Sequence, residues 1–544
     1  MKTTFDTMVA GLQRVYSRFD ADAIADTREY VRRLQRTPLR GTATLSEYHE
    51  CLLFLRAHPS DADMVRLVDA SLTRLATFLR KRRSGHAEAP DSVGLPFVSQ
   101  VTRFSHDCVR WLSRHPHCAV RFEEFAEATL DLNAVLRLTL TTLERSETNA
   151  ELSNDALLDV LGVRPDRRLA FLLAELSRLD GSPYIKDQLY DALGVMVRVT
   201  PTHVDFSAAF NRLPGSTPFY QSERIRQFDA AALIDRTLPS ARRLNTAARE
   251  HVVRVIRNTM TLTSRETDPA TYLDARSLRV FDLDRGVSVA IYGMTHDRQL
   301  ALESYVGFTA FRNGMPVSYG GAWMLGERAD FGMNIFEPYR GGESGYLMCQ
   351  LLRVYHRMFD VRYFEVDAHQ FGLDNPEGID TGAFWFYYRY GFRPVDPALA
   401  VLARREKSRL AAKPLARSTR KTLLALTGSS VALSFGGRAP ISLYQITTRV
   451  TRMVQRHFGG DRPAAERECV SRFLAASGRS RPRDPDQRAA LVELAMVAGA
   501  LRVTDAAGVR LLAEMVEAKP VDVYRYQRLL SAFLSTPRVA SSRQ

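Results

Sequence analysis

The sequence predicts an α+β fold in which a central, mostly antiparallel β-sheet segment, residues 276–397, lies between two all-helical parts. In residues 1–212 and 398–544, apolar side chains recur every three or four positions, which is the period of a helix packed by one face. Between residues 278 and 336 the period changes to two, which is typical of strands. A Pro-Gly-Ser-Thr-Pro run opens the remaining part, residues 213–275, which we expect to be a helical connector.

The composition is that of an ordinary soluble globular protein, with 544 residues, 45% of them hydrophobic and 25% charged. The N-terminus lacks a signal-peptide pattern, and no uncharged apolar run reaches the roughly 20 residues that a membrane helix needs. Five cysteines are scattered without CxxC spacing, so we expect no disulfide framework and a reducing compartment. We therefore expect a cytoplasmic protein with no membrane partner.

The net charge of +14 permits attraction to a polyanion such as nucleic acid. Most basic residues are dispersed along predicted helices, however. We therefore interpret them as solvated helix faces and do not expect nucleic acid as a partner.

Residues 1–212 are predicted to be helical almost throughout. Phe122, Phe125 and Leu132 illustrate the spacing on which this prediction depends. One group of histidines and cysteines in this part has a metal-like composition, but its flanks are helical in pattern, so we interpret the group as packing residues and expect no metal. Its members are His106, Cys108, His115, His117 and Cys118.

The strand-like segment contains two predicted hairpins followed by a further strand. Asp-Arg-Gly joins the first pair of runs and Asn-Gly joins the second, and Asn-Gly between alternating runs is a strong hairpin signal. The predicted strands are residues 278–282, 287–292, 303–312, 316–325 and 329–336. After residue 397 we expect helices again, apart from an irregular piece at residues 427–440.

A glycine-rich turn, residues 339–345, follows the last of these strands and opens an amphipathic helix. Such a turn gathers backbone N–H groups and the positive end of a helix dipole around one point. The turn is therefore predicted to bind an anion such as a phosphate group.

The order of antiparallel strands, Arg-Gly-Gly turn, helix, strand and second helix resembles the GNAT acyltransferase superfamily over residues 276–397. The second helix carries the family's A-x-x-x-Y-x-x-x-G-F pattern at the family's spacing, through Ala383, Tyr387, Gly391 and Phe392.

The resemblance implies that the turn binds the pyrophosphate of an acyl-CoA, with acetyl-CoA as the default donor. The family pattern places a glycine in the middle of the turn, where this chain has Glu343. A carboxylate facing a pyrophosphate would repel it, so we expect this side chain to point away. The residues implied in binding are Arg340, Gly341, Gly342, Ser344 and Gly345.

The resemblance also implies that the strand before the turn and the strand after the helix splay apart. Backbone groups near Asn334, Ile335 and Phe336 would then hydrogen-bond the pantetheine arm and polarise the thioester carbonyl. Tyr387 stands where the family often has a tyrosine that donates a proton to the departing thiolate. The resemblance implies no metal.

The sequence leaves the general base open. Glu365, Asp367 and His369 alternate along one run, so on a strand all three would share a face. His369 has the titration range suited to accepting a proton from an amine. Glu337, at the end of the preceding strand, is a second candidate. Direct attack by a positioned amine does not require a dedicated base.

The helices that wall the acceptor side in the family have little room here, because only residues 295–302 separate the first two of its strands. We therefore expect the flanking helical parts to form that wall.

These observations predict an N-acyltransferase that moves an acyl group from acyl-CoA directly to an amine on a small molecule or a protein. Two alternatives stay open. One is a catalytically inactive GNAT-like module in a helical binding or regulatory protein. The other is a basic nucleic-acid-binding protein.

Overall fold

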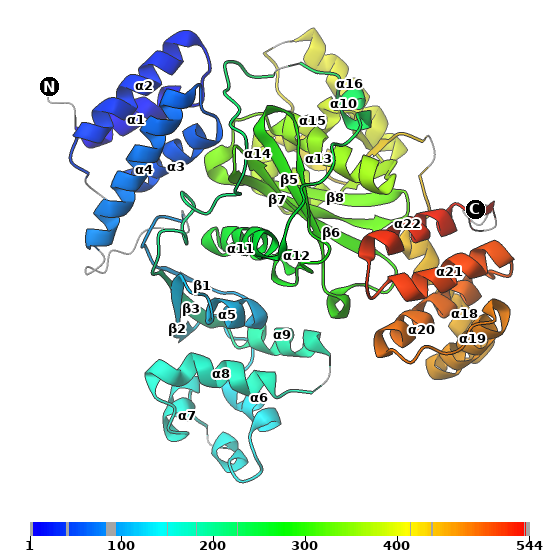
Figure 1. Cartoon of the computed structure of the whole chain (residues 1–544). Helices are drawn as coiled ribbons and strands as arrows, with labels where there is room; N and C mark the ends of the chain where they lie inside the picture. The colour runs from blue at the N-terminus through cyan, green and yellow to red at the C-terminus, as the bar shows by residue number, and fades with distance from the viewer. Residues whose placement is uncertain are drawn as a thin grey trace.

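The computed structural model describes residues 4–39, 43–82, 94–149, 151–180, 182–225, 227–413, 415–436, 439–537 and 539. Figure 1 shows a central sheet, drawn in green, with helical parts around it. The fold is mixed α/β, with one large sheet and one small sheet. Among the described residues, no helix combines the length and apolar character needed to span a membrane.

The large sheet has eight strands in the order β10-β11-β9-β8-β7-β6-β5-β4. Every neighbouring pair is antiparallel except β8 and β9, which are parallel. Both predicted hairpins are confirmed, as β4–β5 and β6–β7, and Asn313 and Gly314 at the second turn both have positive φ. The strands are β4 (Arg279–Asp282), β5 (Val287–Gly293), β6 (Ser304–Arg312), β7 (Met315–Leu325), β8 (Arg328–Ile335), β9 (Tyr363–Val366), β10 (Arg393–Pro394) and β11 (Val431–Ser434).

Strand β11 lies between β9 and β10, where it pairs through Val431 with both Val366 and Pro394. The prediction of an irregular piece here is therefore wrong, and the sheet continues beyond residue 397. Two helices, α16 (Pro397–Ala412) and α17 (Arg420–Leu426), separate β10 from β11 along the chain.

Helices cover both faces of the large sheet. Tyr355 of α13 (Ser344–Phe359) contacts Phe308 on β6. The neighbouring residue on β6, Gly307, lies against Pro269 of α12 (Asp268–Thr271). Because consecutive strand residues point to opposite faces, α12 covers the face opposite α13.

The N-terminal part is not all-helical as predicted. Three strands form a small antiparallel sheet in the order β1-β3-β2: β1 (Gln100–Thr102), β2 (Cys118–Phe125) and β3 (Val195–Pro201). Phe122 and Phe125 lie on β2, where a bulge between Phe122 and Glu124 shifts the register. The bulge brings side chains three positions apart into contact, with ring centroids 4.9 Å apart. The spacing of Phe122 and Phe125 in the sequence therefore matches that of a helix, although both residues lie on a strand.

The buried apolar side chains of the described residues form three clusters. The first N-terminal helices share one cluster with the large sheet, a second lies mainly within residues 104–206, and a third lies mainly within the last five helices. In the connector the first helix begins at Ala230, and the described residues 213–225 and 227–229 before it form no helix. The remaining helices are α1 (Phe5–Val15), α2 (Ala21–Arg36), α3 (Ala43–Ala57), α4 (Ala62–Arg82), α5 (His106–Leu112), α6 (Leu132–Thr139), α7 (Asn154–Val160), α8 (Arg168–Ser177), α9 (Pro183–Ala192), α10 (Ala230–Asp235), α11 (Thr246–Leu262), α14 (Pro376–Thr381), α15 (Ala383–Arg389), α18 (Leu443–Phe458), α19 (Arg462–Ser477), α20 (Pro485–Ala500), α21 (Ala506–Ala518) and α22 (Val523–Leu534).

Candidate functional site

The parallel strands β8 and β9 pair over a short stretch and then diverge. Their register covers three residue pairs, from Arg328–Tyr363 to Asp330–Glu365. Strand β8 continues to Ile335, paired with β7, whereas the chain after β9 turns into a short 3-10 helix, η6 (Ala368–Phe371). Within the described part of the chain, residues 331–335 therefore have no strand partner on the edge that faces β9.

The glycine-rich turn lies at the end of β8, after a 3-10 turn, η5 (Glu337–Tyr339). Gly341 has φ of +84°, and a Cβ there would meet only open space, so this side of the turn faces outward. Helix α13 begins at Ser344, and the first N–H groups of a helix have no acceptor inside it. Arg340 and Gly341 are exposed, Ser344 is half-buried and Gly345 is buried.

Glu343 does not face that outer side. Its side chain is 1% exposed and accepts hydrogen bonds from Arg285 at 2.7 Å, from Arg312 at 3.0 Å and from the backbone N–H of Ile225 at 2.7 Å. Burial alone would raise the pKa of this carboxyl, but the two arginines and the N–H group outweigh it and lower the pKa. The carboxylate is therefore ionised, and the two arginines balance its charge. It is directed into the protein, as expected.

The inner side of the turn contacts the N-terminal helices. Gly342 lies against His58, which follows α3, and a Cβ at position 342 would lie 3.0 Å from its Nε2. Beside them is a cavity of about 20 Å³, which has room for roughly one water molecule. Burial, followed by the charge of Arg312, lowers the pKa of His58 well below its usual value, so its ring is neutral.

Aromatic rings border the first turn of α13. The Tyr390 hydroxyl lies so close to Gly345 that a Cβ there would overlap it. Tyr390 also stacks on Phe228 of the connector, with centroids 5.7 Å apart, and Phe228 contacts Tyr346 edge to face. Gly345 is therefore required by packing, because any side chain would displace Tyr390.

Arg340 is not free in this arrangement. Its guanidinium forms an ion pair with Glu377 near the start of α14, and both side chains are exposed. Exposed pairs of this kind contribute little stability, so an anion can compete for Arg340 at small cost.

Tyr387 of α15 is buried among the rings of Phe371, Phe386 and Phe392. Burial raises its pKa, so the phenol keeps its proton at neutral pH. Within the described residues, its hydroxyl has no hydrogen-bond partner. The phenol is thus a protonated donor in an apolar environment.

The general-base candidates are not brought together. Strand β9 ends at Val366, so Glu365, Asp367 and His369 do not share a strand face, and that prediction is wrong. Glu365 is held by Arg328 at 2.6 Å and by Ser430 at 2.5 Å.

Asp367 caps η6 by accepting the N–H of His369 at 2.9 Å. The Nδ1 atom of His369 lies 2.8 Å from the carbonyl oxygen of Leu373, and its ring is exposed. Glu337 is exposed at the start of η5. His369 and Glu337 are thus both accessible to solvent, one after β9 and the other after β8.

Some of the backbone groups predicted to bind pantetheine are already engaged by β7. The Phe336 N–H donates to the carbonyl of Val317 at 3.1 Å, and the Ser318 hydroxyl donates to the carbonyl of Asn334 at 2.7 Å. Ile335 is half-buried and lines the inner cavity. The free edge of β8 thus begins before these residues, at Phe331.

A short loop, residues 294–303, joins β5 to β6, and both flanking parts contact it. Buried Arg298 pairs with Asp187 of α9 at 2.5 Å and with Asp107 of α5 at 3.1 Å. From the C-terminal part, Lys519 donates to the carbonyl of Ala301 at 2.7 Å, and Tyr526 donates to that of Leu302 at 2.8 Å. Contacts from both sides therefore fix this loop in place.

Sequence reasoning missed the residues that hold the turn. Arg285 was interpreted only as part of a hairpin turn, and Arg312 only as the end of a strand. No sequence pattern around His58 or Tyr390 indicated that these residues contact the turn. The one clue was Glu343 itself, since a carboxylate that is buried needs a cationic partner.

No family model matches this chain, and no curated protein and no solved structure is found to be similar to it.

Proposed function

We propose that this protein is an acyl-CoA-dependent N-acyltransferase with a GNAT-like core, and that acetyl-CoA is its default donor. The observation that carries the proposal is the divergence of β8 and β9 beside the glycine-rich turn. An extended thioester arm can pair with the free edge of residues 331–335, as an added strand would. Its phosphate end would then lie at the outward side of the turn.

In this proposal the pyrophosphate contacts Arg340, the Gly341 backbone and the first N–H groups of α13, at Ser344 and Gly345. The helix dipole favours an anion at this end. Glu343 does not oppose binding, because its charge is directed inward and balanced by Arg285 and Arg312.

The chemical step is direct transfer. The acceptor amine attacks the thioester carbonyl, a C–N bond forms, and the C–S bond breaks. Tyr387 donates its proton to the departing thiolate, for which its raised pKa keeps it protonated. The proton lost by the amine passes to His369, to Glu337 or to water.

The acceptor would approach from the side of residues 295–302, where the flanking parts hold the loop through Arg298, Ala301 and Leu302. Those flanking parts, and not helices of the core, would then select the amine.

Thermal unfolding with acetyl-CoA or adenosine tests donor binding. Acetyl-CoA at 100 times its Kd should stabilise the protein by about 2.7 kcal/mol, whereas adenosine should have no comparable effect. Absence of any shift at millimolar acetyl-CoA would refute the proposal. Stabilisation without release of free CoA thiol, across a panel of amines and peptides, would instead favour the inactive GNAT-like module.

A second function is favoured by the distribution of charge. Residues 398–544 contain 26 Lys and Arg but only 11 Asp and Glu, a net charge of +15, whereas the whole chain carries +14. On α16, Arg404, Arg405 and Lys407 are exposed. Exposed basic side chains can neutralise nucleic-acid phosphates.

Binding of a single-stranded RNA at several salt concentrations tests this second function. The logarithm of the affinity should fall steeply with the logarithm of salt concentration. Replacing Arg404, Arg405 and Lys407 by Glu should abolish binding while leaving any acetyl-CoA stabilisation unchanged. Salt-independent binding, or none, would exclude it.

A further inference from the structure

Two histidines meet where the small N-terminal sheet ends. The antiparallel strands β2 and β3 have Cys118 opposite Pro201 as their outermost pair. Just outside it, the carbonyl of His117 accepts the N–H groups of Thr202 at 2.8 Å and His203 at 3.3 Å. The backbone thus holds the two histidines side by side before any ligand is present.

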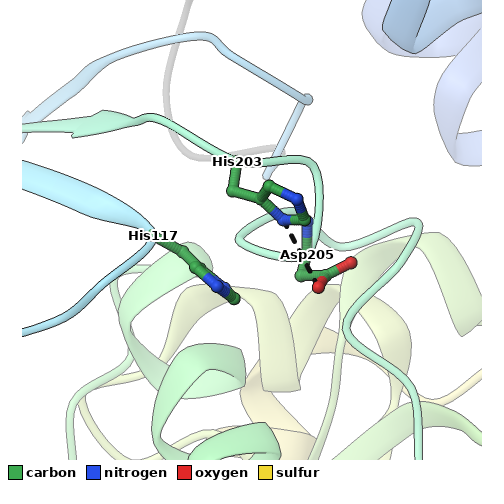
Figure 2. Close-up of side chains that lie close together, drawn as sticks. All are labelled: His117, His203 and Asp205. Carbon is green, nitrogen blue, oxygen red and sulfur yellow. Dashed lines mark hydrogen bonds and ion pairs between the residues drawn. The ribbon is translucent and has the colours of Figure 1, made fainter.

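A carboxylate completes the group. The ligand atoms of His117, His203 and Asp205 all lie within 4.8 Å of one another. Figure 2 shows the His117 ring coming from the strand end, and His203 with Asp205 coming from the loop beside it. The two rings are 4.6 Å apart, and Nδ1 of His203 lies 3.3 Å from the carboxylate of Asp205.

The backbone of His117 is oriented by a hydrogen bond, because its N–H donates to Nδ1 of buried His115 at 3.1 Å. Two imidazoles and a carboxylate, gathered at one point, are the donors that zinc and related ions take.

Neighbouring charges and solvent exposure determine how tightly such a site would bind an ion. Arg254 of α11 acts on both His115 and His117 through its positive charge and contacts Nδ1 of His251 at 3.3 Å. That charge opposes a cation, and the carboxylate of Asp205 offsets it. The side chains of His203 and Asp205 are 53% and 56% exposed, so water can fill the remaining positions around an ion.

We propose that His117, His203 and Asp205 form a binding site for a divalent first-row transition-metal ion, represented here by Zn²⁺. Three protein ligands and open positions define an exchangeable site, in contrast to closed structural sites with four protein ligands. A metal ion binds the neutral imidazole and the ionised carboxylate, so acid should displace it.

An ion bound here would join the end of β2 to the segment that leaves β3. That segment continues into Phe206, which packs on His115 with ring centroids 5.0 Å apart. Occupancy should therefore stabilise the small sheet and its contact with α11, by an amount that grows with metal concentration.

The test uses full-length protein without a histidine tag, stripped of metal by a chelator. Zn²⁺ content after dialysis and the visible absorption of added Co²⁺ report stoichiometry and affinity. We expect one ion per chain, and a rise in the unfolding temperature with Zn²⁺.

Asp205→Asn keeps the shape of an exposed side chain and removes one ligand charge, and His117→Ala removes a ring. Each should weaken binding at least about tenfold, a loss that even an outer partner of a metal ligand can cause. His457→Ala, at an exposed histidine on α18, is the matched control and should bind as the unaltered protein does.

Equal unfolding temperatures in chelator will show that Asp205→Asn folds normally, even if His117→Ala does not. The proposal is overturned if the unaltered protein takes up no ion. It is also overturned if Asp205→Asn retains full affinity and the full Zn²⁺-dependent rise in unfolding temperature.

Discussion

The carboxylate of Glu343 lies 3.0 Å from a guanidinium nitrogen of Arg312, and the two side chains are 1% and 4% exposed. Glu343 immediately precedes α13, whereas Arg312 ends β6. With Arg285 at 2.7 Å, a single buried carboxylate joins the turn to the end of β6 and to the connection between β4 and β5. The shape of the turn is thus determined from inside the protein.

Removing that charge should release the turn. Glu343→Gln leaves two arginines without a counter-ion, and breaking a buried pair costs about 3 kcal/mol or more. We expect roughly 100-fold faster hydrogen exchange in peptides covering residues 338–350. Glu337→Gln, at an exposed carboxylate in η5 just before the turn, is the control and should change little. Equal exchange in both variants would contradict the structural role of Glu343.

The same ion pairs should make the turn sensitive to acid. The pKa of Glu343 is lower in the folded protein than its ordinary value near 4.5, so its contribution is complete above that value. It is lost as the pH falls through the lower, folded pKa. The exchange difference between the unaltered protein and Glu343→Gln should therefore be constant from pH 8 to pH 5 and shrink below about pH 4. A difference that persists unchanged at pH 2 would be inconsistent with this cause.

Gly345 should not tolerate a side chain. A Cβ there overlaps the Tyr390 hydroxyl, and overpacking of this kind typically costs about 1–3 kcal/mol. Gly345→Ala should lower the unfolding temperature. In a protein that already carries Tyr390→Ala, the substitution Gly345→Ala should lower the unfolding temperature by less than it does in the unaltered protein. Independent, additive effects would show that the two positions do not interact.

Arg340 and Glu377 should have opposite effects on acyl-CoA binding. Arg340→Glu places a negative charge beside the pyrophosphate and should weaken affinity at least about tenfold. Glu377→Gln frees Arg340 from its ion pair and should strengthen affinity modestly. Calorimetric titration with acetyl-CoA measures both. If neither variant changes affinity, Arg340 does not contact the ligand.

Tyr387→Phe should separate chemistry from binding. Loss of a general acid typically reduces turnover by about 10²–10⁴-fold, while acetyl-CoA affinity should stay nearly constant. Tyr388→Phe, at the adjacent buried tyrosine, is the matched control and should retain turnover. Equal turnover in both variants would leave Tyr387 with a packing role only.

Local patterns predicted much of the large sheet. Asn-Gly between alternating runs located the β6–β7 hairpin, and the glycine-rich run located the start of α13. The VxVxV pattern of β3 was equally readable, with Val195, Val197 and Val199 buried on one face. The helix-like spacing of the surrounding segments nevertheless favoured a helix here. The bulge on β2 adds to this, because it gives a strand the apolar spacing of a helix.

Long-range relationships could not be predicted. Val431 belongs to the sheet only because β9 and β10 leave a place between them. Glu343 meets Arg285 and Arg312 across 58 and 31 positions, and local periodicity contains no information about such pairs. The direction of the carboxylate, which decides whether the turn can accept an anion, is therefore known only from the structure.

The position of β11 also sets an order for assembly on the ribosome. A nascent chain that ends before residue 431 has made β9 and β10 but lacks the strand between them. The edge of β9 then stays open while α16 and α17 are synthesised, and an open edge can pair with another chain. The sheet that carries the candidate site is thus complete only after about four-fifths of the chain has been translated.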